Sequence, residues 1–319
     1  MTSISFRPAA RENVGLLIGL AGASGSGKTF SAMRLASGIV GAGKRFAVID
    51  TEARRALHYA DAFAFDHAEL RPPFRPGAYV DAIKGADEAG YAAIVIDSMS
   101  HEWAGEGGVL DWQLAEFQRL GSREATKLLS WAEPKKGHKA MVSRLLQSCA
   151  HLIFCLRAEE RVKPEKDAEG KTRIVPIGWQ PVCAKDFPFE LTVSAMLEPG
   201  KPGIPAWLKL QEQHRPIFPS GTPIDEAAGA RLAAWASGAA VEKPAAPPAT
   251  KPAAGPAFNI PDDLKGPARA IVSALRGAKA QALVDDILKI NGAHLLAIKA
   301  ADEAAYEWII GQAPRFEAA

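Results

Sequence analysis

Four short hydrophobic runs stand out in the first half of the chain, at residues 16–21, 46–50, 92–97 and 151–156. Runs of five or six residues without polar alternation are typical of strands that are covered on both faces, as in parallel sheets. Between them lie stretches with helical spacing, including 29–39 and 140–150, the latter with one apolar side made of Met141, Val142, Leu145, Leu146 and Cys149. This alternation predicts an α/β fold with a mainly parallel central sheet flanked by helices.

The pattern changes towards the C-terminus. Residues 189–198 and 204–211 flank a turn-rich Pro/Gly segment, which predicts an antiparallel pair extending the sheet. Residues 239–258 hold eight Ala and five Pro, a composition typical of an extended linker. Helical spacing returns beyond it. The sequence therefore predicts a main domain over 1–238, a linker over 239–258 and a small helical domain over 259–319.

The amino-acid composition excludes a few classes of protein but does not select one. The 319 residues are 48% hydrophobic and 23% charged, which excludes a wholly disordered chain. A net charge of +2 excludes a polycationic coat for nucleic acid or membrane. The three cysteines lack metal-ligand or disulfide-scaffold spacing, and no apolar stretch approaches membrane-spanning length. We expect a cytoplasmic protein with reduced thiols that does not enter a membrane.

The first strand runs directly into a phosphate-loop motif. Residues 22–29 read Gly-Ala-Ser-Gly-Ser-Gly-Lys-Thr, which fits GxxxxGK[ST], and a helical pattern follows. Glycines permit positive φ, so that backbone N–H groups converge on phosphate oxygens, while the lysine supplies charge and the threonine a hydroxyl for Mg²⁺. The alternative is a flexible Gly/Ser loop. The predicted nucleotide-contacting residues are Gly22, Ala23, Ser24, Gly25, Ser26, Gly27, Lys28, Thr29 and Phe30, with positive φ expected at Gly22, Gly25 and Gly27.

Two carboxylates follow neighbouring predicted strands. Asp97 ends the run at 92–97, where it would hold Mg²⁺ through a water while Thr29 binds the metal directly and Ser98 supports the water shell, as in a Walker B element. Glu52 follows the run at 46–50, and a carboxylate there can take a proton from an attacking water. The alternatives are an aspartate that merely ends a strand and a solvated acid.

A family resemblance becomes visible at this point. Residues 48–52, followed by 56–60, resemble bacterial RecA recombinases, in which the second strand carries the catalytic glutamate and an adenine-stacking tyrosine comes seven residues later. The resemblance implies that Glu52 is the general base and that Tyr59 stacks on adenine, with a packed aromatic as the alternative for Tyr59. Residues 97–108, Trp131 and 151–157 are similar to compact RecA-like ATPases of bacteriophages, which are AAA-type nucleotide-binding proteins, some of them active in single-strand annealing recombination.

This resemblance, over about residues 14–220, implies further roles. The strand that follows Asp97 in the sequence should lie between the strand that ends at Asp97 and the phosphate-loop strand. A polar sensor residue is expected at its end. RecA has glutamine there, whereas this chain offers Arg157, which would stabilise the transferred phosphoryl group or read the neighbouring loop; an exposed arginine is the alternative. Residues 209–216 occupy the place of basic residues that reach the neighbouring subunit's ATP, which makes Arg215 or Lys209 a candidate finger in trans or a surface ion-pair residue.

The segment 158–173 sits where RecA-like proteins carry a mobile DNA loop. Residues 133–173 hold ten Lys/Arg against six Asp/Glu. The alternative is a solvated β-hairpin with Trp179 packed beneath it. The residues expected to contact nucleic acid, by following its backbone or by stacking on a base, are Lys135, Lys136, Lys139, Arg161, Lys163, Lys171, Arg173 and Trp179.

These patterns together predict an enzyme that converts ATP and water to ADP and phosphate with Mg²⁺. We expect it to act as a homo-oligomer on single-stranded DNA in phage-type recombination, annealing, repair or replication, with DNA stimulating hydrolysis and the C-terminal module binding a protein partner. One alternative is a P-loop phosphotransferase with Arg157 and Arg161 as lid residues. Another is a non-catalytic, nucleotide-dependent assembly switch.

Overall fold

The computed structural model describes residues 11, 14–166, 171–239, 259–278 and 281–313. The chain divides into two compact units, Met1–Pro244 and Ala245–Ala319. The predicted linker lies outside the described residues except for Ala239. Each unit is therefore described by itself.

A single sheet forms the centre of the first unit. Its order is β3-β2-β4-β5-β1-β7-β8, and β6 pairs with β5 off this path. Neighbours from β3 to β7 run parallel, while β8 is antiparallel to β7. The strands are β1 (Leu17–Gly22), β2 (Phe46–Asp50), β3 (Phe65–Glu69), β4 (Ala93–Asp97), β5 (His151–Lys166), β6 (Thr172–Pro181), β7 (Val193–Leu197) and β8 (Pro205–Lys209).

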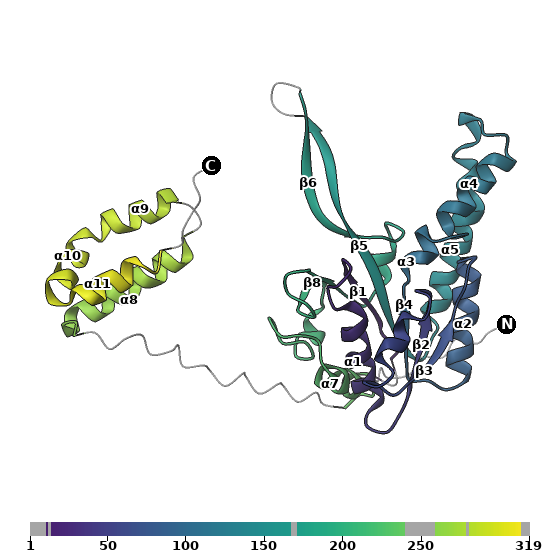
Figure 1. Ribbon diagram of the computed structural model, residues 1–319, viewed down its shortest axis with the longest axis horizontal. Helices are drawn as coiled ribbons and strands as arrows, with labels where there is room; N and C mark the ends of the chain where they lie inside the picture. The colour runs from purple at the N-terminus through teal and green to yellow at the C-terminus, as the bar shows by residue number, and fades with distance from the viewer. Residues whose placement is uncertain (1–10, 12–13, 167–170, 240–258, 279–280, 314–319) are drawn as a thin grey trace. The chain divides into compact units, whose positions relative to one another are not determined.

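Helices cover both faces of this sheet (Figure 1). Alternate strand residues point to opposite faces, so Ile18 packs with α1 and α7, while Leu17 packs with α2 and α5. Because both faces are buried, the predicted strands lack polar alternation. The helices of this unit are α1 (Lys28–Val40), α2 (Pro76–Glu88), α3 (Ser100–Ala104), α4 (Val109–Arg119), α5 (Ala132–Leu145), α6 (Phe187–Glu190) and α7 (Glu226–Ala236), with the 3₁₀ helices η1 (Arg55–Tyr59), η2 (Glu124–Thr126), η3 (Leu129–Trp131) and η4 (Glu212–His214).

The α/β fold with a mainly parallel sheet is confirmed, and so is the antiparallel pair, which is β7 and β8. The sensor strand β5 lies between β4 and β1, as the resemblance implied. Two details were wrong. The edge strand β3 was missed because its sequence, Phe-Asp-His-Ala-Glu, is short and mostly polar, and the helix expected at 140–150 is α5, which ends at Leu145 and leaves Leu146 and Cys149 exposed.

Strand β5 continues well beyond the predicted end at residue 156. From Ala158 to Lys166 it pairs with β6 in an antiparallel hairpin, with an irregularity between Arg161 and Val162. The hairpin projects from the sheet (Figure 1). Among the described residues, the polar segment after Arg157 therefore forms strands of a β-hairpin, and Trp179 is half-buried against the core.

The second unit is a small helical module, as predicted. Its core includes Ile271, Leu275, Val284 and Ile309, whereas Leu283 is exposed. Among the described residues no helix is both long enough and apolar enough to span a bilayer. The helices are α8 (Asp262–Gly277), α9 (Gln281–Ile290), α10 (Gly292–Ala301) and α11 (Glu303–Ile310).

Candidate nucleotide site

The phosphate loop joins β1 to α1. Gly25 has a φ of 79° and Gly27 a φ of 86°, values that glycine adopts without steric cost. Gly22 was expected to share this conformation but lies within β1. A Cβ at Gly22 would come within 2.4 Å of the Ser26 Oγ and 2.6 Å of the Leu197 carbonyl oxygen, so glycine is required there for close packing.

Two side chains at the end of the loop, Lys28 and Thr29, already have partners. The Lys28 Nζ donates to the Ala23 carbonyl oxygen at 2.8 Å, across the loop that it closes. The Thr29 Oγ1 donates to the Asp97 Oδ2 at 2.6 Å. A hydroxyl next to a carboxylate fits Mg²⁺, which takes few protein ligands and completes its shell with water and phosphate oxygens. These two residues are the ones that would hold the ion.

Asp97 lies in a buried position at the end of β4. Burial raises the pKa of its carboxyl to about 6, and the nearby acids Glu52 and Asp50 act in the same direction, while the Thr29 hydrogen bond and Lys28 oppose them. A bound cation would favour the ionised form. The Ser98 hydroxyl, expected to support the metal's water shell, donates to the Cys155 carbonyl oxygen, and Ser98 also lines the cavity.

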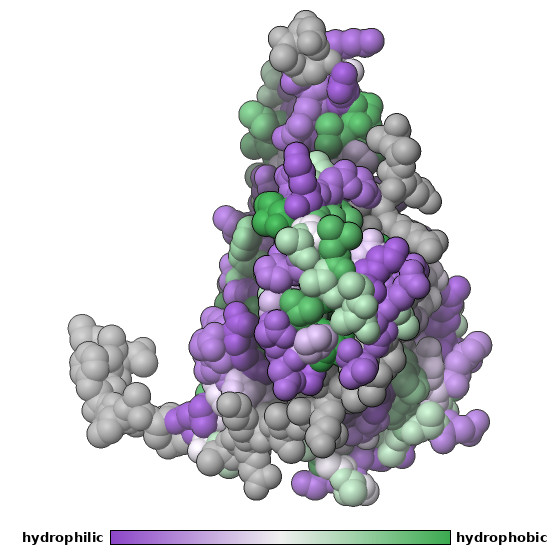
Figure 2. All heavy atoms as spheres, turned by 90° about the vertical axis from the view of Figure 1, so that its left-hand side faces the viewer, coloured by the Kyte–Doolittle hydropathy of each residue, from purple (hydrophilic) through white to green (hydrophobic). Residues whose placement is uncertain are grey.

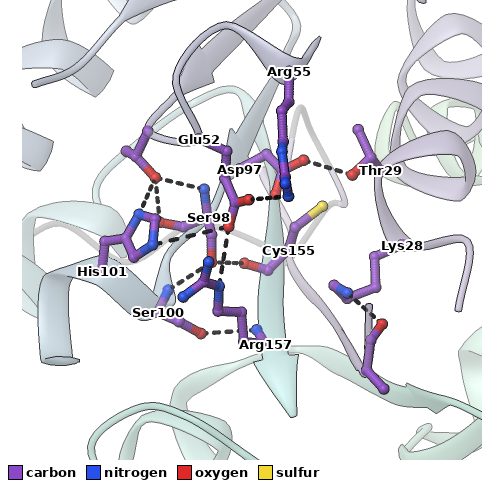
Figure 3. A network of polar contacts seen from close by, with 12 residues as sticks. Lys28, Thr29, Glu52, Arg55, Asp97, Ser98, Ser100, His101, Cys155 and Arg157 are labelled. Atoms are coloured by element: carbon purple, nitrogen blue, oxygen red, sulfur yellow. Dashed lines mark hydrogen bonds and ion pairs between the residues drawn. The ribbon is translucent and has the colours of Figure 1, made fainter. Parts of the chain in front are cut away.

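Glu52 is held between two arginines. Its Oε1 accepts from the Arg157 Nε at 3.1 Å, and its Oε2 accepts from the Arg55 Nη1, also at 3.1 Å. The His101 Nε2 lies 3.9 Å from Oε1. Figure 3 shows these side chains converging on the carboxylate from η1, β5 and α3. The acid predicted as the base is thus fixed in place, and Arg157 faces it.

The backbone around Glu52 is fixed by its neighbour Asp50. The buried Asp50 carboxylate accepts from the N–H of Glu52 at 2.7 Å and from the N–H of Ala56 at 3.0 Å. Thr51 accepts from the N–H of Ser98 at 2.8 Å and so ties the ends of β2 and β4 together. Sequence reasoning missed these positioning roles, although an aspartate two residues before a turn N–H is a known local signal.

A cavity of about 470 Å³ brings the predicted residues together. Tyr59 lines the cavity and also packs against the core, with its ring centroid 6.0 Å from that of Phe30. Tyr59 is therefore both a cavity residue and a packed aromatic. Three predicted loop contacts, Ala23, Ser26 and Phe30, do not line it. The lining residues are Gly22, Ser24, Gly25, Gly27, Lys28, Thr29, Glu52, Arg55, His58, Tyr59, Asp97, Ser98, Arg157, Ala158 and Glu159.

A family model described as an AAA domain matches residues 15–182. The match covers 168 of 319 residues, more than half of the chain, and contains the phosphate loop, Asp97 and the hairpin. The chain belongs to this AAA domain family. It is therefore an AAA-type P-loop protein, a class that binds nucleotides, generally with Mg²⁺, and has ATPase activity. No curated protein matches the chain.

Within the AAA domain, the predicted nucleic-acid residues fall on two elements. Lys135, Lys136 and Lys139 lie on α5, where Lys135 sits over the Trp131 ring at 5.6 Å and Lys136 is 3.9 Å from Glu133. Arg161 and Lys163 lie on β5 and Arg173 on β6, while Lys171 directly precedes β6. Trp179, the residue expected to stack on a base, is half-buried and packs against the core.

The two faces of the hairpin differ in chemistry. Alternation along β5 places Arg161 and Lys163 on one face and Val162 on the other, where cross-strand pairing also places Ile174. Val162 is 57% and Ile174 63% exposed. Hydrophilic and hydrophobic side chains accordingly lie next to each other over the hairpin and the surface below it (Figure 2).

The candidate fingers in trans lie outside the cavity of their own chain. The Lys209 Nζ donates to the Phe189 carbonyl oxygen at 2.7 Å, and Arg215 pairs with Glu212 at 2.6 Å. Arg215 is more than half exposed. Both side chains therefore make contacts within the first unit.

Proposed function

We propose that this AAA domain is a RecA-like, DNA-stimulated ATPase that acts on single-stranded DNA in phage-type recombination, annealing, repair or replication. One observation carries the proposal. Arg157, Ala158 and Glu159 line the nucleotide cavity and belong to β5, which continues without interruption into the basic hairpin. Because one strand reaches both places, a change at the phosphates is transmitted to the hairpin.

In the proposed reaction, Lys28 and the loop N–H groups bind the phosphates, and Thr29 with Asp97 holds Mg²⁺. Glu52 takes a proton from a water, whose oxygen bonds to the γ-phosphorus while the bond to the ADP oxygen breaks. Arg157 stabilises charge on the transferred group, and Tyr59 stacks on adenine. Transfer of the labelled γ-phosphate to a small acceptor would support a phosphotransferase, and binding without turnover would support an assembly switch.

The hairpin face that carries Arg161 and Lys163 is expected to contact the DNA backbone. Replacing Arg161 and Lys163 together with serine removes two positive charges, so we expect about tenfold weaker binding of a single-stranded oligonucleotide and a shallower salt dependence. ATP turnover without DNA should stay the same. The measurements are fluorescence anisotropy at several salt concentrations and phosphate release with and without the oligonucleotide.

The control for this pair is a Lys44→Ser, Lys84→Ser variant, which removes the same charge from exposed positions away from the hairpin. Equal DNA binding by both double variants, or equal turnover with and without DNA in the unaltered protein, contradicts the DNA part of the proposal.

The apolar face of the hairpin supports the proposed homo-oligomer, because exposed apolar patches mark interaction surfaces. Replacing Ile174 with aspartate is expected to lower the particle mass and the DNA-stimulated turnover, since Arg215 or Lys209 must reach the next subunit's ATP. Mass photometry with ATP and single-stranded DNA measures this. Ile290→Asp, at a position of the helical module that is even more exposed, is the control. An unchanged mass for Ile174→Asp contradicts the assembly role of this face.

A further inference from the structure

Two arginines from different elements share the carboxylate of Glu52, one on each oxygen. The Glu52 side chain is 12% exposed, whereas that of Arg55 is 72% and that of Arg157 54% exposed. The acid is therefore held by its surroundings, while the arginines are long side chains at the surface. When an anion enters the cavity, the arginines are the groups free to change partner.

The turn before Arg55 directs it to this place. Ala53 and Arg54 have φ values of 54° and 68°, a left-handed conformation that is costly for residues other than glycine and is often found at functional sites. This turn gives the neighbouring residues Arg54 and Arg55 different partners. Arg54 pairs with Glu69 at 3.1 Å and does not line the cavity, whereas Arg55 lines it and pairs with Glu52.

Charge in the cavity favours an exchange of partners. Besides His58, its lining has three Lys/Arg side chains, Lys28, Arg55 and Arg157, and three acidic ones, Glu52, Asp97 and Glu159. A terminal phosphate carries up to about two negative charges, against one for a carboxylate. Arginine also binds phosphate oxygens with strong, charge-assisted hydrogen bonds. A γ-phosphate in this cavity therefore competes with Glu52 for its arginines.

We propose that Arg55 exchanges its ion pair with Glu52 for an oxygen of the γ-phosphate when ATP binds. Arg55 is then a phosphate-contacting residue of this AAA domain. The exchange also frees the Oε2 lone pair of Glu52, which a general base needs in order to accept a proton. This inference rests on the proposed function, in which the cavity binds ATP and Glu52 is the base.

The test compares two nucleotides that differ in the γ-phosphate. Calorimetry with Mg²⁺ and either ADP or the β,γ-imido analogue of ATP is expected to show about tenfold weaker binding of the analogue by the Arg55→Gln variant. Its affinity for ADP should be unchanged. Arg54→Gln is the matched control, since it removes the neighbouring guanidinium without touching the cavity, and both affinities should be unchanged.

Three results would overturn the role of Arg55. Unchanged affinity for the analogue shows that Arg55 does not contact the γ-phosphate. An equal loss for both nucleotides shows that it only shapes the turn. Faster hydrolysis with unchanged affinities shows that it merely restrains Glu52.

Failure of the proposed function is recognised separately. Absence of binding by the unaltered protein removes the nucleotide site altogether, and full hydrolysis by a Glu52→Gln variant removes the base. Neither result resembles a selective loss of affinity for the ATP analogue.

Discussion

Replacing Lys28 with alanine is expected to weaken the binding of Mg²⁺-ATP by at least about 100-fold, or about 2.7 kcal/mol. The Lys28 ammonium lies at the start of α1 and reaches back across the phosphate loop to the Ala23 carbonyl oxygen, 2.8 Å away. Its loss removes the one positive side chain of the phosphate loop, so that within the loop only backbone N–H groups and the helix dipole remain to hold the phosphates. Isothermal calorimetry with ATP and Mg²⁺ measures the loss.

Lys44→Ala is the control for this variant, because Lys44 is an exposed lysine beyond the other end of α1. Its affinity for ATP should equal that of the unaltered protein. Circular dichroism should show that both variants keep the fold, since the Lys28 side chain makes a single hydrogen bond to the loop. Binding of ATP by Lys28→Ala with ordinary affinity would contradict the proposed nucleotide site.

The elements that place this site could be predicted because their signals are local. The runs at 46–50 and 151–156 are buried on both faces, so their apolar character alone marks β2 and the first part of β5. The phosphate loop is recognisable by its spacing, and Asp97 and Glu52 follow strands whose ends meet at one edge of a parallel sheet. The cavity brings both acids to Lys28 and Thr29, as that logic requires.

The remaining features depend on contacts between distant residues. Strand β3 is specified by pairing with β2, not by its own polar sequence. The length of the hairpin is set by cross-strand pairing of β5 with β6. This pairing could not be predicted from a polar, turn-rich sequence. The role of Arg55 depends on the left-handed turn before it and on the opposing Arg157, which is 102 residues away along the chain.

The polar side chains behind the acids were also beyond sequence reasoning. His101 bonds to Thr51 at 2.8 Å and stacks on Phe74, so one imidazole connects α3 to the end of β2. Its neighbour Glu102 is buried and pairs with His138 of α5 at 2.9 Å. Helix α3 thus contacts Thr51, next to Glu52, through His101 and contacts α5 through Glu102. Only the folded backbone brings these residues together.

Replacing Glu52 with glutamine is expected to lower the rate of ATP hydrolysis by about 10²- to 10⁴-fold while ATP still binds. Glutamine has nearly the same shape, and its amide oxygen can accept from Arg157 or Arg55, but it cannot take a proton from water. The contacts that hold the backbone come from Asp50 and are unaffected. Phosphate release measures the rate, and calorimetry with ATP and Mg²⁺ measures the binding.

Glu69→Gln is the matched control, because Glu69 is also paired with two arginines, Arg54 and Arg71, but lies outside the cavity at the end of β3. Its rate of hydrolysis should equal that of the unaltered protein. If Glu69→Gln and Glu52→Gln hydrolyse ATP equally fast, the attacking water is activated by another group. If Glu52→Gln also loses ATP binding, the carboxylate organises the phosphate site instead of acting as its base.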